Sequence, residues 1–507
     1  MQPFVKKAPT ELRIVILLFL LVQALPIARA HDDEDGHSHA PAAVTNKERY
    51  RPTAMPDRII LTMSGDPRTT QSVTWRTSTE VNEAFTEIAV AEAGPGFPRK
   101  ATKHQAKTER LKSDLSESHY HRFTFEKLKP GTTYAYRVGD GGKNWSEWCH
   151  FKTAAATDEG FSFVYFGDAQ NSVRSMWSRV VREAYRDAPR AAFFLHAGDL
   201  INRAESDGEW GEWFEAGGWL NRSTPSIAVP GNHEQASTAL GRRLSRHWRP
   251  TFTFAENGPK GLEESCYTLV YHNLRIVALN SNVELEKQAE WMDRVLAENK
   301  APWVVCTFHH PVFSTGNDRD NATLRTLWKP IFDKHQVDLV LQGHDHTYGR
   351  TGLDVPGVQE FNERMKEEAR KRAEAKAKAK KKAELEAEKK AEQESNPNVE
   401  SESECSPSES NVPTGVQKVE PTFGTVYVVS VSGPKMYNNT QHEFMTRVAE
   451  DTQLYQIIHI DGDQLSFEAR TAVGELYDAF ELHKQDGKIN KLVDRQPDTP
   501  QRLRKSK

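Results

Sequence analysis

The sequence predicts a layered α/β domain that follows an all-β sandwich, and three observations lead to this fold class. From Phe161 onward, near-continuous apolar runs of strand length alternate with helix-like segments, a pattern typical of a sheet covered on both faces. Residues 57–154 contain shorter alternating strands separated by Gly and Pro turns, as in a β-sandwich. The chain has 507 residues, enough for two or three domains.

The apolar runs locate the strands of the α/β domain. We expect strands at 161–166, 191–195, 226–229, 274–279, 303–308 and 337–341. The strand pattern resumes at 424–431 and continues in a β-rich C-terminal part that includes 455–460 and 465–469. Ligand sites of open α/β sheets lie beyond the carboxyl ends of the strands, so polar residues that directly follow these runs are the first candidates for a functional site.

The N-terminus has the pattern of a secretory signal peptide. A basic region precedes an apolar stretch from Ile14 to Leu25, and Ala28-Arg29-Ala30 fits a cleavage site before His31. We therefore expect an exported protein, secreted, periplasmic or in the cell envelope. An uncleaved anchor is the alternative, but a membrane span needs about 20 apolar residues. The His/Asp-rich segment that follows is either a loose metal-binding stretch or a solvated N-terminus.

A charged segment separates the α/β domain from its C-terminal strands. Residues 357–393 are dominated by Glu, Lys, Ala and Arg and predict a long exposed helix, and residues 395–412 are rich in Ser, Glu, Pro and Asn. The helix lacks the sustained apolar seam of a stable coiled coil. The expected organisation is a signal peptide (1–30), a polar linker (31–55), a β-sandwich (56–155), a catalytic domain (160–356 and 416–490), a helical and disordered insertion (357–415) and a polar tail (491–507).

Charge and cysteine content exclude some classes of protein. The formal net charge is −4, which gives no bulk attraction to nucleic acid, and we expect no nucleic-acid partner. We expect no membrane span after signal cleavage, because no other apolar run has the required length. Four cysteines in this length form no disulfide framework, and Cys306 lies in an apolar run where a buried free thiol is expected.

Five polar clusters follow the predicted strands and carry the candidate chemistry. In chain order they are Gly167-Asp168, Gly198-Asp199, Gly231-Asn232-His233-Glu234, His309-His310-Pro311 and Gly343-His344-Asp345-His346. Each cluster alone would be a common turn, but five in succession at strand ends indicate one shared site. Carboxylate, amide oxygen and imidazole together suit zinc, manganese or iron, and the neighbouring glycines allow sharp turns and close approach of the backbone.

This series of motifs resembles the calcineurin-like metallophosphoesterases. The segment from Leu128 to Val138, Leu-x-Pro-Gly-Thr-x-Tyr-x-Tyr-x-Val, resembles a fibronectin type III domain. A module of that kind before the catalytic domain is similar to the plant-type purple acid phosphatases. The resemblance covers roughly residues 55–350 and 420–480. It implies a metallophosphoesterase β-sandwich flanked by helices and an enzyme with two metal ions, iron, zinc or manganese.

The resemblance also implies a role for each site residue. Asp168 and His346 would hold the first metal, Asp199 would bridge both metals, and Asn232, His309 and His344 would hold the second metal. His233 would face the substrate as general acid. His310 would either support the ligands or face the substrate. Glu234 would orient His233, or would be a purely structural carboxylate.

The sequence departs from the purple acid phosphatase pattern at two positions of the first metal site. That pattern has Gly where this chain has Gln170, and an iron-binding Tyr where it has Asn202; the wider superfamily uses His at the position of Gln170. We therefore expect no ferric-tyrosinate colour and weaker binding at the first site than at the second. Gln170 or Asn202 could supply an amide oxygen, or water could fill the position.

The function expected from this reading is hydrolysis of phosphate monoesters, as in acid phosphatases, by a metal-bound hydroxide with a His general acid. The partner would be a small phosphorylated substrate. Two alternatives remain open. The same site could serve a phosphodiesterase or nucleotidase, because the metal core does not decide the substrate. Alternatively, a weakened first site could belong to a non-enzymatic binding protein of the envelope.

Overall fold

The computed structural model describes residues 43–239, 241–394 and 424–504. The predicted signal peptide, the segment that begins at His31, Cys405 and residues 395–423 of the predicted insertion lie outside the described residues. The chain divides into two units, Met1–Thr45 and Asn46–Lys507, and the helices and strands of the described residues all belong to the second. Within the described ranges, none of the helices combines the length and the apolar character that a bilayer span requires.

The N-terminal β region is a two-sheet sandwich, as predicted. One face is a four-stranded sheet, and the other is the end of a longer sheet. Val73 and Trp75 of one sheet and Tyr136 and Phe151 of the other are buried in a shared core, because alternate residues of a strand point to the same face. The short sheet contains β3 (Phe85–Val90), β4 (Thr102–Gln105), β7 (Thr133–Gly139) and β8 (Cys149–Lys152), and the long sheet contributes β1 (Asp57–Thr62), β2 (Gln71–Thr77), β5 (Lys107–Lys112) and β6 (Glu117–Phe125).

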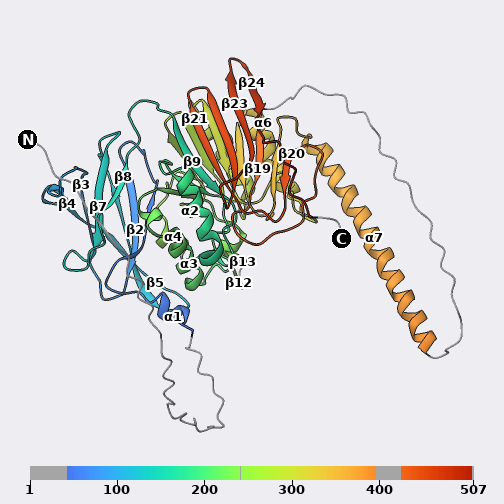
Figure 1. Ribbon diagram of the computed structural model, residues 1–507, viewed down its shortest axis with the longest axis horizontal. Coiled ribbons are helices and arrows are strands. Elements are labelled where there is room, and N and C mark those ends of the chain that lie inside the picture. Colours follow the sequence, from blue (N-terminus) through green and yellow to red (C-terminus); the bar gives the residue numbers. More distant parts are fainter. Residues whose placement is uncertain (1–42, 240, 395–423, 505–507) are drawn as a thin grey trace, which may run out of the picture. The chain divides into compact units, whose positions relative to one another are not determined.

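The α/β region consists of two mixed sheets that pack face to face (Figure 1). In the first sheet, β9 (Phe161–Phe166), β10 (Phe194–His196) and β11 (Ser226–Ala228) are parallel neighbours. In the second sheet, β15 (Leu274–Ala278), β16 (Trp303–Thr307), β17 (Leu339–Gln342) and β19 (Val426–Val429) are parallel neighbours. β14 (Tyr267–Tyr271), β18 (Tyr348–Thr351) and β20 (Met445–Ala449) complete the second sheet. The predicted α/β fold class is therefore confirmed.

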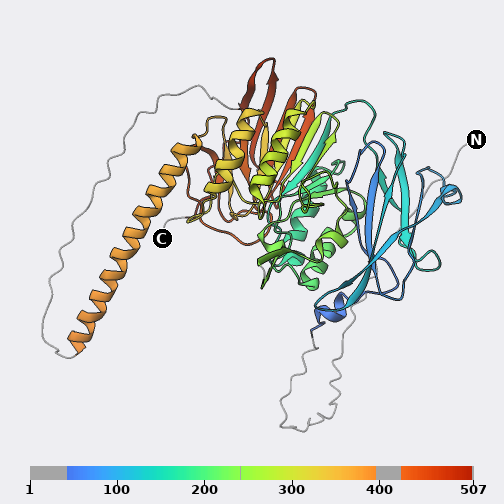
Figure 2. The ribbon, with the colours of Figure 1, turned by 180° about the vertical axis from the view of Figure 1, so that it is seen from behind.

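Alternation along the strands explains why both faces of these sheets are covered. Val305 of β16 belongs to the core between the sheets, whereas its neighbours Val304 and Cys306 pack on the opposite face. That opposite face is covered by helices α5 (Leu285–Ala297) and α6 (Ala322–Lys334), which Figure 2 shows in yellow in front of the sheets. Helices α2 (Ser178–Asp187) and α3 (Asp207–Gly217) contribute Val180 and Trp213 to the core that includes β9 and β10.

The two predicted domains share one sheet, which the sequence pattern did not indicate. Strand β1 of the N-terminal sandwich pairs in parallel with β11 of the α/β region at Thr62 and Ser226. The 11-stranded sheet therefore runs from β24 through β9, β10 and β11 into β1, β2, β6 and β5. Backbone pairing between strands so distant in the chain leaves no mark in local periodicity.

The predicted charged helix is α7 (Val358–Glu394). Phe361 and Met365 near its start are buried against the core that contains α5 and α6, whereas residues 373–387 are exposed. The C-terminal strands β21 (Leu454–Asp461), β22 (Gln464–Thr471), β23 (Leu476–Gln485) and β24 (Lys488–Asp494) extend the first sheet beyond β9. β24 therefore crosses the expected start of the polar tail at residue 491. The other described α-helices and strands are α1 (Asn46–Arg49), α4 (Trp248–Thr251), β12 (Gln235–Thr238) and β13 (Gly241–Leu244).

Candidate metal centre

The five polar clusters converge at one edge of the two packed sheets. Asp168, Asp199 and Asn232 follow the parallel strands β9, β10 and β11 of the first sheet. His309 follows β16 of the second sheet, and His344 and His346 follow β17. Because the carboxyl ends of parallel strands meet at the same edge, all of these side chains reach one site from two sheets.

The backbone at the site is held in a conformation that most residues avoid. Asp168, Asp199, His344 and His346 have φ values of 37°, 52°, 76° and 51°. A positive φ in a residue other than glycine costs of the order of 1–3 kcal/mol and persists only where the surroundings enforce it. The site is therefore organised by its loops before any ligand binds.

Two glycines of the motifs allow the loops to approach each other. A Cβ atom at Gly343 would lie 2.3 Å from Oδ2 of Asp168, and one at Gly231 would lie 2.1 Å from Oδ1 of Asp199. Any larger residue at these positions would displace a carboxylate of the site. The glycines at positions 231 and 343 of the motifs are therefore required by the close approach of these carboxylates.

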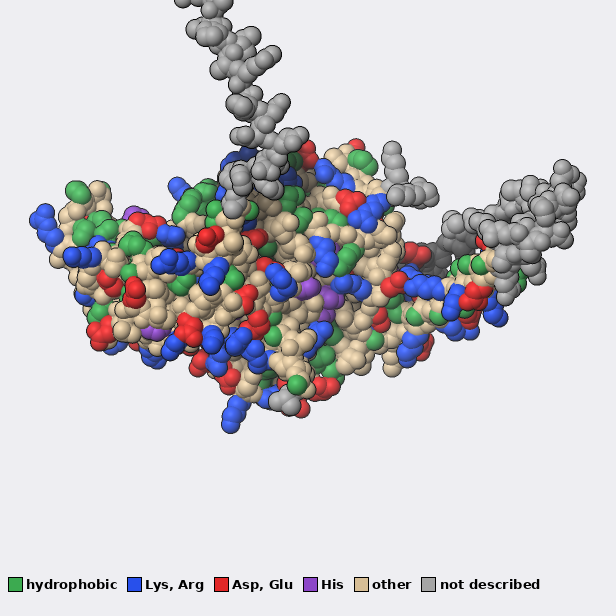
Figure 3. Space-filling view, turned by 90° about the horizontal axis from the view of Figure 1, so that it is seen from below, with side chains coloured by type: hydrophobic (Ala, Val, Ile, Leu, Met, Phe, Trp, Pro, Cys, Tyr) green, Lys and Arg blue, Asp and Glu red, His purple; other side chains and the backbone are tan. Residues whose placement is uncertain are grey.

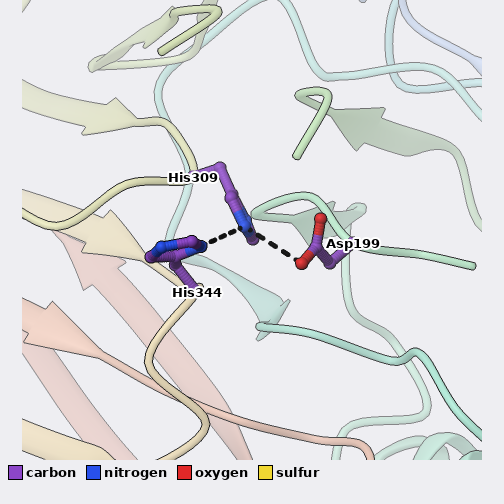
Figure 4. Close-up of side chains that lie close together, drawn as sticks. All are labelled: Asp199, His309 and His344. Carbon is purple, nitrogen blue, oxygen red and sulfur yellow. Dashed lines mark hydrogen bonds and ion pairs between the residues drawn. The ribbon is translucent and has the colours of Figure 1, made fainter. Parts of the chain in front are cut away.

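One group of donors gathers around Nε2 of His309 (Figure 4). This atom lies 3.1 Å from Oδ2 of Asp199, 3.1 Å from Nδ1 of His344 and 3.1 Å from Oδ1 of Asn232. Nδ1 of His309 is bonded to the carbonyl of Ala197 at 2.9 Å, which leaves Nε2 to face the group. The four side chains predicted for the second metal are therefore in contact.

A second group consists of Asp168, Asp199 and His346, all buried. Nε2 of His346 lies 3.7 Å from Oδ1 of Asp168, and Nδ1 of His346 is bonded to the carbonyl of Lys435 at 2.9 Å. Asp199 belongs to both groups, the position that a bridging carboxylate requires.

Electrostatics favour a cation at this site. Burial, opposed by His309 and reinforced by Asp199, raises the pKa of Asp168 well above its usual value. Burial would also raise the pKa of Asp199, but the ion pair with His309 outweighs burial and lowers it. Burial opposes a charge on His309, yet Asp199 raises the pKa of this imidazole to about 9. The buried Asp199 carboxylate therefore holds a positive charge at His309, the charge that a metal ion would replace.

The residues present fit metal ions. Oδ1 of Asp168 is buried and has no hydrogen-bond partner in the described part of the chain, an arrangement that is costly unless something else binds the atom. Zinc lies about 2.0–2.2 Å from nitrogen and oxygen ligands, so two ligands that make an angle of about 90–109° at one ion are separated by about 3–3.5 Å. The 3.1 Å separations around His309 match this spacing.

The two predicted catalytic histidines flank the metal-binding groups. Nδ1 of His233 is bonded to the carbonyl of Asn202 at 2.6 Å, and its Nε2 lies 3.9 Å from Oδ2 of Asp199. His310 is bonded through Nδ1 to the hydroxyl of Ser281 at 2.9 Å, and burial lowers its pKa to about 3. The ring of His310 lies 4.4 Å from that of His344, so His310 is a neutral group beside the ligands.

Glu234 does not orient His233, which corrects the first of the two roles considered for it. Its carboxylate is fully buried and accepts hydrogen bonds from the backbone N–H groups of Asp199 at 2.9 Å, Leu200 at 2.8 Å and Gly231 at 2.7 Å. Glu234 therefore ties together the loops that follow β10 and β11. The carbonyl of Asn202 orients His233 instead, and a backbone atom gives no signal in the sequence.

The two residues considered as substitutes at the first site differ in position. Gln170 is fully buried, and its Nε2 lies 3.0 Å from Oδ2 of Asp199 and 2.9 Å from Nε2 of His346. The backbone of Asn202 is bonded to His233 and Glu209, and no contact joins its side chain to the described ligands.

Cationic and aromatic residues that the sequence did not single out surround the ligands. Nη1 of Arg319 donates to the carbonyl of His344 at 2.6 Å. The ring of Tyr437 lies 4.8 Å from that of His346, and Arg319 lies over Tyr437 at 4.8 Å. In Figure 3, histidine side chains reach the surface near the middle of the face, with Lys and Arg side chains beside them. No motif marks Arg319 or Tyr437, because only the fold brings them to the site.

Comparison with known proteins identifies the two regions. Residues 56–153 match the family of the purple acid phosphatase N-terminal domain, and residues 161–348 match the calcineurin-like phosphoesterases. Residues 161–348 are a calcineurin-like phosphoesterase domain. The predicted family resemblance is confirmed for both regions, and the phosphoesterase domain contains every predicted site residue.

Several curated relatives of this chain are phosphatases by name. The chain is 28% identical over 266 residues to acid phosphatase type 7 of Danio rerio, a match that covers 45% of this chain and 57% of that protein. It is 25% identical over 258 residues to a purple acid phosphatase of Glycine max, covering 47% of this chain and 54% of that protein. The chain thus spans a little more than half the length of these relatives.

A solved structure shares the fold of the phosphoesterase and N-terminal domains. The purple acid phosphatase isolated from yellow lupin seeds superposes with a TM-score of 0.61 and 17% sequence identity, over 84% of this chain and 74% of that one. This similarity confirms the predicted order of an N-terminal β domain and an α/β domain.

Proposed function

We propose that the chain hydrolyses phosphate monoesters in a reaction that depends on two metal ions. The observation that carries this proposal is the pair of donor groups that share Asp199. Asp168 and His346 would hold the first ion, Asn232, His309 and His344 the second, and Asp199 both. Once bound, the ions would supply positive charge to the phosphoryl oxygens and lower the pKa of water toward 7.

His233 is the proposed general acid. Its Nδ1 is bonded to the carbonyl of Asn202, so this nitrogen carries the hydrogen and Nε2 faces Asp199 at 3.9 Å. A leaving alkoxide at this edge of the site would take its proton from Nε2 of the protonated ring. Proton transfer by a positioned group typically contributes about 10²- to 10⁴-fold to a rate.

His310 is proposed to act next to His344 without a charge. Burial keeps its ring neutral at physiological pH, and Ser281 fixes its orientation. A neutral imidazole in this position can donate one hydrogen bond from Nε2 to a phosphoryl oxygen, with Nδ1 accepting from the hydroxyl of Ser281.

The proposed setting is outside the cytoplasm. The basic region, the apolar stretch to Leu25 and the small residues at Ala28 and Ala30 support export. The substrate is proposed to be a small phosphorylated molecule, in line with the printed names of the phosphatases to which the chain is similar.

The experiment that tests the proposal is hydrolysis of a chromogenic phosphomonoester by metal-reconstituted protein, with bound metal measured in each sample. Asp199→Ala should lose both metal and activity. His233→Ala should keep its metal and lose about 10²-fold or more in kcat. His150→Ala, at an exposed position of β8, is the matched control and should behave as wild type.

Two outcomes would overturn the proposal. Metal-loaded wild type that cleaves neither this ester nor a diester would favour a binding protein. Preference for a chromogenic diester would favour the phosphodiesterase alternative on the same residues.

A further inference from the structure

The first metal-binding group has fewer protein donors than the second. Asp168, Asp199 and His346 are its only His, Cys, Asp or Glu members among residues 43–239, 241–394 and 424–504. The second group has Asp199, His309 and His344 together with the amide oxygen of Asn232. A fourth donor at the first site must come from another type of residue.

The amide of Gln170 occupies that fourth position. Its nitrogen, Nε2, lies 3.0 Å from Oδ2 of Asp199 and 2.9 Å from Nε2 of His346. These separations are close to those of ligands about 90° apart on one ion, about 3 Å for ion–ligand distances of about 2.0–2.2 Å. The backbone N–H of Gln170 donates to the carbonyl of Asp199 at 3.0 Å, which anchors the residue beside the bridging carboxylate.

The oxygen of the same amide has no partner among the described residues. Oε1 of Gln170 is buried and makes no hydrogen bond there. Nδ1 of His346 is bonded to the carbonyl of Lys435, so Nε2 is an acceptor and the amide nitrogen donates to it. Without a cation, the N–H side of the amide therefore faces two acceptors. With a cation between those acceptors, only the oxygen has lone pairs to offer.

We propose that Gln170 is the fourth protein ligand of the first metal ion, through its amide oxygen, and that the amide rotates by a half-turn when the ion binds. This inference shares one assumption with the proposed function, namely that Asp168, Asp199 and His346 bind a metal ion. The rotation exchanges two atoms of similar size and needs no movement of the backbone. It also gives the buried oxygen a partner.

The ligand set selects the charge of the ion. An amide oxygen is neutral, so the first site has two carboxylates, one of them shared with the second site, and no anionic side chain beyond these among the described residues. Carboxylate and carbonyl oxygens suit Mn²⁺, and three of the four proposed donors are oxygens of these kinds. The first site is therefore a divalent site, with Mn²⁺ as its probe.

The test compares Mn²⁺ binding to wild type, Gln170→Ala, Gln170→Glu and Asn202→Ala by equilibrium dialysis with metal analysis, and by electron paramagnetic resonance. Wild type should bind two ions per chain and give the signal of a coupled pair. Gln170→Ala should bind the first ion about tenfold or more weakly, which is the loss in affinity typical when a side chain around a metal is removed. Retention of the second ion would show that this variant is folded. Gln170→Glu adds an anionic oxygen of the same reach and should tighten the first site by at least a similar factor.

One matched control and two contrary outcomes complete the test. Asn202→Ala removes the other amide considered for this site and should bind both ions as wild type does. Equal binding of two ions by wild type and Gln170→Ala would overturn the proposal. So would one ion in wild type and two in Gln170→Ala, because Gln170 would then block the site. Ion binding is measured without substrate, so this test does not depend on turnover. If Gln170 binds the ion as proposed but the protein hydrolyses no phosphate ester, the proposed function is wrong and the ligand assignment stands.

Discussion

Arg319 donates a hydrogen bond of 2.6 Å from Nη1 to the backbone carbonyl of His344, and the same nitrogen lies 3.6 Å from the carboxylate of Asp345. Asp345 in turn accepts from the backbone N–H groups of Thr315 at 2.6 Å and Gly316 at 3.0 Å. The loop before α6 and the loop that carries His344 and His346 are thus bonded to each other. This connection holds two proposed metal ligands in their unusual backbone conformation.

Replacing Arg319 should loosen the second metal site. Arg319→Ala removes the donor to the His344 carbonyl and the cation over Tyr437, and residues that support ligands typically change metal affinity about 10- to 100-fold. Arg319→Lys keeps one donor and should lose less. A competition titration with a chelator measures the change, and Arg246→Ala, an exposed arginine paired with Glu205, is the control. Unchanged affinity in Arg319→Ala would show that the loop holds its shape without this contact.

Removing the Glu234 carboxylate should destabilise the protein as well as the site. Glu234→Ala leaves four buried N–H groups without this acceptor, and each such group costs about 1–3 kcal/mol. We expect a loss of at least about 3 kcal/mol in the free energy of unfolding, and a smaller loss for Glu234→Gln, which retains one acceptor oxygen. Denaturant unfolding measures both. Glu92→Ala, which removes an exposed pair with Lys100, should change stability by less than about 1 kcal/mol.

Stability should fall in acid because histidines are buried in neutral form. Burial lowers the pKa of His196 to about 3, whereas an unfolded histidine titrates near 6.5. Between these values the unfolded chain binds a proton that the folded chain does not, so stability is complete above about pH 6.5 and is lost as the pH falls below it. The slope is at most about 1.4 kcal/mol per pH unit for each such residue.

His196→Phe isolates this effect. The ring of His196 stacks on Phe166 at 5.5 Å, and neither of its nitrogens has a hydrogen-bond partner in the described residues. The variant should therefore tolerate pH 5 better than wild type, by up to about 2 kcal/mol relative to the difference at pH 7.5. Unfolding at both pH values, with exposed His150→Phe as control, provides the measurement. An identical acid dependence in wild type and His196→Phe would contradict the assignment.

Substitutions at the buried start of helix α7 should lower the free energy of unfolding, whereas substitutions in its exposed part should leave it nearly unchanged. Phe361 is 1% exposed and contacts Phe313 at a ring distance of 5.2 Å, whereas Leu385 on the same helix is 56% exposed. Phe361→Ala should cost about 3–5 kcal/mol. Leu385→Ala should cost less than about 0.5 kcal/mol. Thermal unfolding compares the two, and equal effects would mean that the exposed part of the helix packs on something in solution.

The sequence predicted the parts of this molecule that local patterns determine. Strand positions such as 161–166 followed from apolar runs, and Asp168, Asp199 and His346 were candidates because they stand directly after such runs. The contacts of Glu234 and Arg319 could not be predicted, since both bind backbone atoms of loops far away in the chain. The position of Gln170 was left open because an amide at a turn has no distinctive spacing.

The pairing of β1 with β11 has a consequence for how the protein can be divided. Cutting the chain between the sandwich and the phosphoesterase domain would leave each piece with a strand edge that its partner had covered. Open edges of this kind invite pairing with other chains. The sandwich therefore covers an edge strand of the phosphoesterase sheet. We expect either half, when produced by itself, to aggregate through the exposed edge.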